Sequence, residues 1–222
     1  MSKNNKILDM SNSPMMMEEK DQPIWVGEFD TDAAKAFCNA LFEASEKDAG
    51  RPIVVYINSG GGDVSGLLAM MSAMDSVPNK IVTVAMGFAM SAGAILLAHG
   101  QMRFVSPHAR VMVHKIQAGA FGNMDDILNE AEWLTNVNDY VMGVLAKDCK
   151  RSKADIEKAL SGPKREVYLN PSEAVAFGLA DMIGVPKVLQ TPPNPVDSGY
   201  VVSVMGLPDP AVKTKSKKKT SK

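Results

Sequence analysis

The chain has 222 residues, of which 45% are hydrophobic and 22% are charged, and its formal net charge is −1. This composition is typical of a soluble protein that buries one sizeable core. The near-neutral net charge gives no overall support for nucleic-acid binding, which needs a basic surface.

Both ends of the chain differ in composition from its middle. Residues 1–19 are mostly polar, and residues 186–222 pass from a Pro-containing segment to a Lys-rich one. We therefore predict one domain over residues 20–185, between a flexible N-terminal segment and a disordered, solubilising tail. The N-terminal segment is too polar for a signal peptide, and two distant cysteines favour a reducing compartment, so we expect a cytoplasmic protein.

The first half of the chain alternates between strand and helix patterns. Residues Pro52–Asn58 form a continuous apolar run, which is typical of a strand buried on both faces. The apolar residues from Val64 to Val77 recur at helical spacing, and Pro78 ends that helix. The alternation predicts an α/β fold with a parallel sheet and right-handed crossovers. The other predicted elements are strands Pro23–Phe29 and Lys80–Met86, and a helix from a cap at Thr31 or Asp32 to about Lys47, stopped by Gly50.

Residues Val84–Ala98 place a serine between a strand and a helix. Small residues surround Ser91, and a serine at such a turn exposes its hydroxyl beside main-chain amides. The spacing differs from the G-x-S-x-G of α/β-hydrolases. Residues Ile81–Ala98 are uncharged and long enough to suggest a membrane span, but Gly87 and Ser91 interrupt them. We therefore prefer a buried strand, a turn and a buried helix, and expect no membrane partner.

The second half of the chain predicts short strands and one long helix. Asn123 caps this helix, which is expected to run to about Lys150, and its apolar stripe needs a partner. The stripe consists of Ile127, Ala131, Leu134, Val137, Val141 and Val144. The other predicted helices are one after Ser91 that runs to His99 with Gly100 as its C-cap, one capped by Ser152 that runs to Leu160, and one capped by Asn170 and stopped by Gly178. The other predicted strands are Met102–Val105, Arg110–His114 and Val167–Leu169.

A triple glycine could complete a site around Ser91. Residues Gly60–Gly62 follow a strand and open a helix, where main-chain amides favour an anion. No Gly-Lys-Ser/Thr follows, so this is not a nucleotide-binding loop. The amides of Gly62 and Ala92 would instead form an oxyanion hole.

The chain has three histidines, and a serine nucleophile needs one of them as its base. His99 ends a helix, where a cation is favoured without any further role. His108 lies in a Ser-Pro-His loop and is expected to be exposed. His114 ends an apolar strand and is the best-placed base. Cys38 and Cys149 are far apart and lack the spacing of a metal site, so we expect no metal.

Four segments carry a resemblance to a known family: INSGGGDVSGLLAM (57–70), GFAMSAGA (87–94), RVMVHK (110–115) and YLNPSEAVAFGLAD (168–181). In this order they resemble the proteolytic subunit of Clp protease (ClpP), over nearly all of residues 24–185. The resemblance implies a crotonase-like α/β fold with a protruding long handle helix, and two stacked heptameric rings around a chamber. It implies a serine endopeptidase that cuts peptides and unfolded proteins without a cofactor and is usually fed by an ATP-consuming AAA+ unfoldase.

The resemblance also implies roles for individual residues. Ser91 would be the nucleophile that forms an acyl-enzyme, His114 its base, and Gly62 and Ala92 the oxyanion amides. The residues expected to hold an extended substrate are Gly61, Val64, Gln117, Ala118 and Gly119.

Some positions depart from the family pattern. The family's acid is an aspartate two residues before an aromatic, and its position falls on Glu166, two residues before Tyr168; a surface glutamate without a role is the alternative. Gly60 replaces a proline usual in the glycine loop, and the proline usual after His114 is missing. The N-terminal segment that meets the ATPase matches poorly, so partnership with an unfoldase stays open, and the chain resembles a phage or accessory version.

Three other functions are weighed against the peptidase. A catalytically weak or inert regulatory subunit would keep the fold and co-assemble with an active ClpP subunit, for example one of a host. A crotonase-type acyl-CoA enzyme would share the fold, but does not need Ser91 with His114. A signal-peptide-peptidase relative would use a Ser–Lys dyad, for which the lysines are poorly placed and His114 is superfluous.

Overall fold

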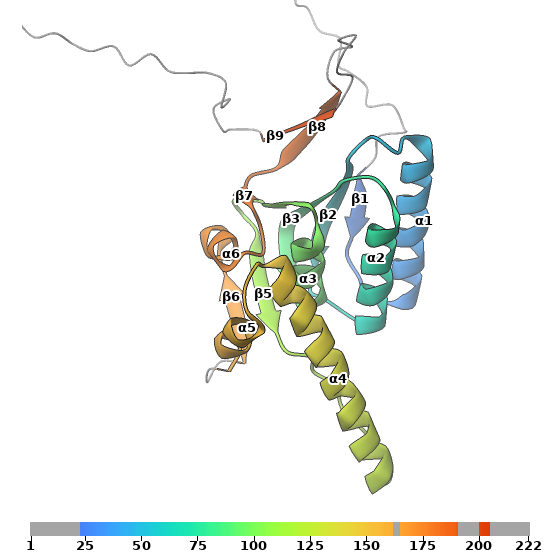
Figure 1. Ribbon diagram of the computed structural model, residues 1–222, viewed down its shortest axis with the longest axis vertical. Helices are drawn as coiled ribbons and strands as arrows, with labels where there is room; N and C mark the ends of the chain where they lie inside the picture. Colours follow the sequence, from blue (N-terminus) through green and yellow to red (C-terminus); the bar gives the residue numbers. More distant parts are fainter. Residues whose placement is uncertain (1–22, 162–164, 191–199, 205–222) are drawn as a thin grey trace, which may run out of the picture.

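The computed structural model describes residues 23–161, 165–190 and 200–204. Figure 1 shows a twisted sheet with helices against it and one long helix projecting from the body. The strands are β1 (Ile24–Val26), β2 (Ile53–Ser59), β3 (Ile81–Met90), β4 (Met102–Val105), β5 (Arg110–His114), β6 (Glu166–Leu169), β7 (Met182–Ile183), β8 (Pro186–Gln190) and β9 (Tyr200–Val204). The helices are α1 (Thr31–Lys47), α2 (Val64–Ser76), α3 (Ala92–His99), α4 (Met124–Asp148), α5 (Lys153–Ala159) and α6 (Pro171–Phe177).

Parallel pairing dominates the main sheet. Its described strands run in the order β1-β2-β3-β4-β7, all parallel to their neighbours, and β5 lies parallel to β3 beyond the end of β4. Strand β6 pairs with β5 in the antiparallel direction. The predicted α/β fold with a parallel sheet and connecting helices is therefore confirmed, with one antiparallel strand added at the β5 edge.

Strand β3 is longer than predicted and divides its pairing between two neighbours. Its first half, Val82–Ala85, pairs with β4, whereas Phe88–Met90 pair with β5. The predicted end at Met86 is wrong because pairing with β5 keeps the chain extended beyond Gly87. A Cβ atom at Gly87 would collide with Oδ1 of Asn58, the atom that accepts the Phe88 N–H, so a larger residue would displace the Asn58 side chain from this hydrogen bond.

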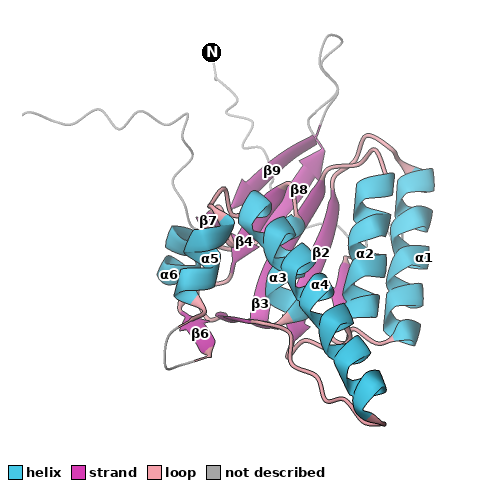
Figure 2. Cartoon of the chain, turned by 60° about the horizontal axis from the view of Figure 1, so that its bottom comes forward, coloured by secondary structure: helices cyan, strands magenta, loops and turns pink. Residues whose placement is uncertain are grey.

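Helices α1 and α2 lie side by side against the strands (Figure 2). The predicted apolar face of α2 is confirmed, because Leu67, Met71 and Met74 are buried in the main core. A smaller buried cluster of Val82, Val84 and Phe104 lies apart from that core. None of the described helices combines the length and the apolar character that a membrane crossing requires.

The capping of two helices, α1 and α3, differs from the prediction. The cap of α1 is Asp30 rather than Thr31 or Asp32, because its carboxylate accepts the Ala33 N–H at 2.7 Å. The same helix ends at Lys47, as predicted, but its C-cap is Asp48 and not Gly50. Gly100 does cap α3, but in extended backbone, and a Cβ atom there would lie 2.3 Å from Oγ1 of Thr83. Glycine is thus needed for close packing at this end, and not for a left-handed conformation.

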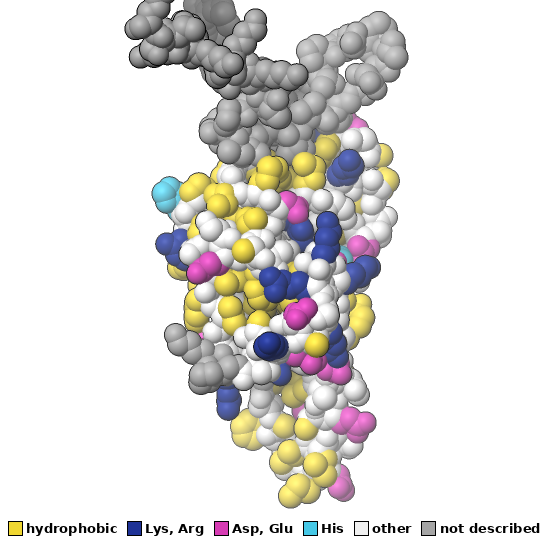
Figure 3. Space-filling model, turned by 60° about the vertical axis from the view of Figure 1, so that its left-hand side comes forward, with side chains coloured by type: hydrophobic (Ala, Val, Ile, Leu, Met, Phe, Trp, Pro, Cys, Tyr) yellow, Lys and Arg dark blue, Asp and Glu magenta, His cyan; other side chains and the backbone are white. Residues whose placement is uncertain are grey.

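Helix α4 is buried only along its C-terminal third. Val141, Met142, Leu145 and Ala146 are buried, whereas Met124, Leu128 and Trp133 are 70%, 59% and 56% exposed. The predicted stripe is therefore split: Val141 lies in the core, but Ile127 is 38% exposed. Figure 3 shows hydrophobic side chains gathered at the lower end of the molecule, over the projecting end of α4.

The C-terminal segment contains order that we did not predict. Residues 186–190 (β8) and 200–204 (β9) form a two-stranded antiparallel sheet, so the expectation of a disordered tail is wrong for them. The expected flexible N-terminal segment, residues 1–19, and the Lys-rich end lie outside the described residues, and the proposed domain division stays a prediction.

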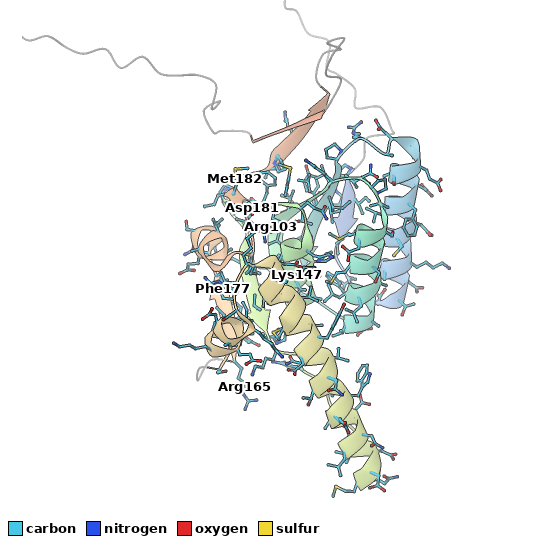
Figure 4. The ribbon with its side chains drawn as sticks, viewed as in Figure 1. Arg103, Lys147, Arg165, Phe177, Asp181 and Met182 are labelled. Atoms are coloured by element: carbon cyan, nitrogen blue, oxygen red, sulfur yellow. The ribbon has the colours of Figure 1, made fainter. Side chains whose placement is uncertain are left out.

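Arg103 and Asp181 join β4 to the turn before β7 (Figure 4). Arg103 is 7% exposed, and its guanidinium donates to both carboxylate oxygens of Asp181 at 3.1 and 2.5 Å. It also donates to the carbonyl oxygens of Asp148 and Gly178, each at 2.8 Å. A buried cation with this many acceptors is satisfied, which explains Asp181 as a structural residue.

His99 joins the C-terminal ends of α3 and α4. Its Nδ1 lies 2.8 Å from Asp148 and its Nε2 lies 3.1 Å from Asp75 of α2. Burial by itself lowers the pKa of His99, but the hydrogen bonds and charges of Asp148 and Asp75 outweigh it and raise the pKa above its ordinary value. The imidazolium therefore stabilises the C-terminal end of α4, where Asp148 lies.

This cluster predicts a pH-dependent stability. A raised pKa in the folded state gives stability that is complete below about pH 6.5, the ordinary value, and is lost as pH rises through the folded value. We expect His99→Gln to lower the free energy of unfolding by about 2 kcal/mol at pH 6 and by less at pH 9. Urea unfolding at both pH values measures this. A difference between variant and wild type that grows with pH would contradict the assignment.

Candidate active site

Three strand ends meet around Ser91. Strand β2 runs beside β3 up to the pair Ser59 and Ala89, and β5 pairs with β3 up to Met112 and Met90. The N–H of Ser91 then donates to the carbonyl of Met112 at 2.8 Å. The carboxyl ends of parallel strands commonly form binding sites, because the following loops converge there.

Ser91 has a strained backbone at the start of α3. Its φ is 53° and its ψ is −119°, and a non-glycine residue with positive φ is uncommon. Strain of this kind persists only where surrounding structure enforces it, and it is concentrated at functional sites. The bond from Ser91 to Met112 and the helix that follows supply that enforcement here, and they leave Ser91 half-buried in the lining of a pocket.

The hydroxyl of Ser91 contacts His114. Oγ of Ser91 lies 2.7 Å from Nε2 of His114, a normal hydrogen-bond length. His114 lies on β5 two residues beyond Met112, so the strand pairing that positions Ser91 also positions the backbone of His114. The structure thus brings together the predicted nucleophile and the predicted base.

The glycine loop packs directly on Ser91. Gly61 has a φ of 106°, and a Cβ atom there would lie 2.7 Å from Cβ of Ser91. Its N–H donates to Oγ of Ser59 at 3.0 Å, which holds the loop at the end of β2. Gly62 has a φ of 154°, and its missing side chain leaves space for Phe29.

Gly62, Ala92, Ser91 and His114 line one small pocket of about 80 Å³. Among the described residues, neither the Gly62 nor the Ala92 N–H donates to another protein group. Free amides beside a nucleophile are the arrangement of an oxyanion hole. The apolar wall of the pocket is formed by Leu67, Ile95, Val141 and Met142.

Two of the predicted substrate residues line this pocket. Val64, at the start of α2, and Gln117 both line it. Ala118 and Gly119 follow without regular structure and are exposed. The sequence did not suggest Asn138 of α4, whose Oδ1 accepts the Ile116 N–H at 3.1 Å and so holds the segment after His114.

The carboxylate of Glu166 is not hydrogen-bonded to His114. Glu166 lies directly opposite His114 in the β5–β6 register, but its Oε2 accepts a hydrogen bond from the hydroxyl of Tyr168 at 2.7 Å. Nδ1 of His114 is buried and has no partner among the described residues. The expected contact of acid and base is therefore not formed. Tyr168 was not expected to act; its i, i+2 spacing from Glu166 on a strand is the signal that could have suggested it.

The remaining candidates lie outside this site. His108 is exposed, as predicted, and His99 is held by its two carboxylates. Cys38 and Cys149 are both free thiols, and burial raises the pKa of Cys149 to about 11, which makes it unreactive. Within the described ranges, no three His, Cys, Asp or Glu side chains are grouped to hold a metal ion.

Comparisons with known proteins agree with this arrangement. The sequence model of the Clp protease family matches residues 9–187. The chain is also 36% identical over 159 residues to a protein of Rhodococcus jostii (strain RHA1) named ATP-dependent Clp protease proteolytic subunit 3. That match covers 71% of this chain and 77% of the relative.

The glycine loop gives a prediction with a neighbouring control. Gly61→Ala would force a Cβ atom against Ser91 at a positive φ, so we expect it to lower the free energy of unfolding by about 2 kcal/mol. Gly60→Ala meets nothing within 4 Å and is expected to change it by less than about 0.5 kcal/mol. Urea unfolding measures both. Equal effects of the two substitutions would show that Gly61 does not pack as described.

Proposed function

Because the chain belongs to the Clp protease family, we propose that it is a serine endopeptidase with Ser91 as its nucleophile and His114 as its base. The observation that supports this most directly is the 2.7 Å distance between Oγ of Ser91 and Nε2 of His114. Hydrogen-bond contact between a nucleophile and a base is the first geometric requirement of this chemistry.

In the proposed reaction, Ser91 attacks the carbonyl carbon of a peptide bond. Nε2 of His114 takes the hydroxyl proton as the new C–O bond forms, and then gives it to the leaving amine nitrogen as the C–N bond breaks. An acyl ester on Ser91 remains. A water molecule then attacks the ester, again losing its proton to His114, and release of the carboxylic acid returns that proton to Ser91.

The developing negative charge needs donors that are already in place. We propose that the N–H groups of Gly62 and Ala92 bind the oxyanion, because both line the pocket of Ser91. Extended substrate would pair with the backbone at Gly61 and Val64 on one side and at Gln117–Gly119 on the other. Recognition by backbone pairing makes side-chain selectivity loose.

Glu166 is proposed as the third member of the triad. Residues directly opposite in an antiparallel pair have Cβ atoms about 5 Å apart, within reach of a glutamate side chain. Its carboxylate would accept the Nδ1–H of His114, fix the tautomer and stabilise the imidazolium.

The proposed chemistry uses only side chains and main-chain amides, so we propose no resident cofactor or metal. The relative from Rhodococcus is named ATP-dependent, and by analogy ATP would be consumed by a partner unfoldase of the Clp type. The proposed location is the cytoplasm, and the proposed substrates are peptides and unfolded proteins.

One observation favours a second function. The unpartnered Nδ1 of His114 would suit a catalytically weak or inert subunit that co-assembles with an active one. Measured turnover by the purified chain alone separates the two functions, because an inert subunit needs a catalytic partner.

Assembly into two stacked heptameric rings is proposed from the family and from the exposed apolar residues of α4. Met124, Leu128 and Trp133 of this helix are 70%, 59% and 56% exposed, and Phe121 in the segment before it is 96% exposed. Apolar patches of this kind are usually covered in an assembly. The helix projects from the body (Figure 1), where a second copy could pack against it.

The proposed nucleophile gives a prediction for turnover. Ser91→Ala should lower kcat for a fluorogenic peptide by about 10⁴-fold or more, because the acyl-enzyme cannot form. Ser72→Ala, which removes an exposed hydroxyl bonded within its own helix, should leave kcat unchanged. Retained turnover in the Ser91 variant would refute the assignment, provided that both variants assemble as the wild type does.

The projecting helix gives a prediction for assembly. Leu128→Glu places a charge on the exposed apolar face of α4 and should weaken assembly by at least about tenfold in dissociation constant. Glu132→Gln on the same helix should not, because this side chain is already polar and exposed. Sedimentation velocity over a concentration series measures this. Wild-type protein that sediments as a monomer throughout would contradict the proposed chamber.

A further inference from the structure

The buried Nδ1 of His114 requires an explanation. A polar atom buried without a partner loses its hydrogen bond to water and gains none, which is costly. Such atoms are rare in folded proteins, and each one points to strain, to function or to a partner that arrives later. The side chain directly opposite His114 on β6 is a carboxylate, the natural acceptor for this N–H.

That carboxylate is bound by another donor. Successive side chains of a strand alternate between its two faces, so Glu166 and Tyr168 lie on one face of β6 and His114 lies opposite the first of them. The hydroxyl of Tyr168 donates to Oε2 of Glu166 at 2.7 Å. This bond turns the glutamate along β6 instead of across to β5.

The hydroxyl of Tyr168 is available as a donor at neutral pH. The hydrogen bond and the negative charge of Glu166 raise the pKa of Tyr168, because both favour the protonated phenol. The tyrosine is 62% exposed, so the core does not constrain its ring. Its position therefore depends on the bond to Glu166, and the two side chains can separate without disturbing the fold.

We propose that Tyr168 is a positioning residue that controls the triad, because its hydroxyl competes with Nδ1 of His114 for the carboxylate of Glu166. When Glu166 bonds to Tyr168, the imidazole lacks its acid and Ser91 is poorly activated. When Glu166 releases Tyr168 and bonds to His114, the triad is complete. This inference rests on the proposed peptidase function and explains how the chain can hold both an aligned dyad and an unpartnered Nδ1.

The competition predicts a gain of activity on removing the hydroxyl. Tyr168→Phe keeps the ring but frees Glu166, so kcat should rise about threefold to tenfold while KM stays within about twofold. Tyr140→Phe is the matched control, because Tyr140 is 61% exposed, as Tyr168 is, but lies on α4 and outside the β5–β6 pair; its kcat should not change. A kcat of Tyr168→Phe that equals or falls below that of the wild type overturns the proposal.

A double-mutant cycle tests whether Tyr168 acts through Glu166. In a Glu166→Ala background there is no carboxylate to release, so adding Tyr168→Phe should leave kcat unchanged. A merely structural effect of the hydroxyl would instead appear in both backgrounds. The same rise in both therefore overturns the proposed competition.

A crystal structure of Tyr168→Phe tests the inference without turnover. We expect a carboxylate oxygen of Glu166 within hydrogen-bond distance of Nδ1 of His114, whereas a carboxylate that stays away from the imidazole overturns the proposal. If the wild type and all variants show no Ser91-dependent hydrolysis, the peptidase function fails, and the crystal structure still decides whether Tyr168 and His114 compete.

Discussion

The divided pairing of β3 determines where the two proposed reacting side chains meet. The strand pairs with β4 along Val82–Ala85 and with β5 along Phe88–Met90, and this second pairing brings the Ser91 N–H onto the carbonyl of Met112. Because His114 lies two residues further along β5, the imidazole reaches Oγ of Ser91 without any specific loop conformation. A site held by strand pairing is more rigid than one carried on loops, and that rigidity allows Ser91 to keep its positive φ.

The sequence predicted those features that depend on local patterns. Neighbouring residues were enough to predict the alternation of strands and helices, the serine at a strand-to-helix turn and the histidine that ends a strand. The four ordered segments then indicated one family that has all of these features. The full length of β3 could not be predicted, because Gly87 has a low strand propensity. The pairing with β5 that overrides this propensity is a long-range contact. Likewise, the two-stranded sheet of β8 and β9 lies in a Pro-containing stretch whose composition alone favours disorder.

For the proposed acid, Glu166, the sequence motif predicted the position in the strand but not the hydrogen-bond partner of the side chain. Counting from Tyr168 places Glu166 opposite His114, and the strand register agrees with that count. However, the register fixes only where the backbone lies, and a glutamate has three rotatable bonds with which to choose a partner. Here the tyrosine two residues along is that partner. The same aromatic residue that identified the position in the sequence therefore decides the hydrogen bonding at it.

The most direct test of the central claim is covalent labelling of Ser91. The wild-type protein is incubated with a fluorophosphonate, digested, and mapped by mass spectrometry, in parallel with His114→Gln. If the contact between Ser91 and His114 activates the hydroxyl, the phosphonyl group is found on Ser91 in the wild type, and its rate of formation falls by orders of magnitude in the variant. An unlabelled Ser91 in the assembled wild-type protein, or equal labelling in the variant, contradicts the account.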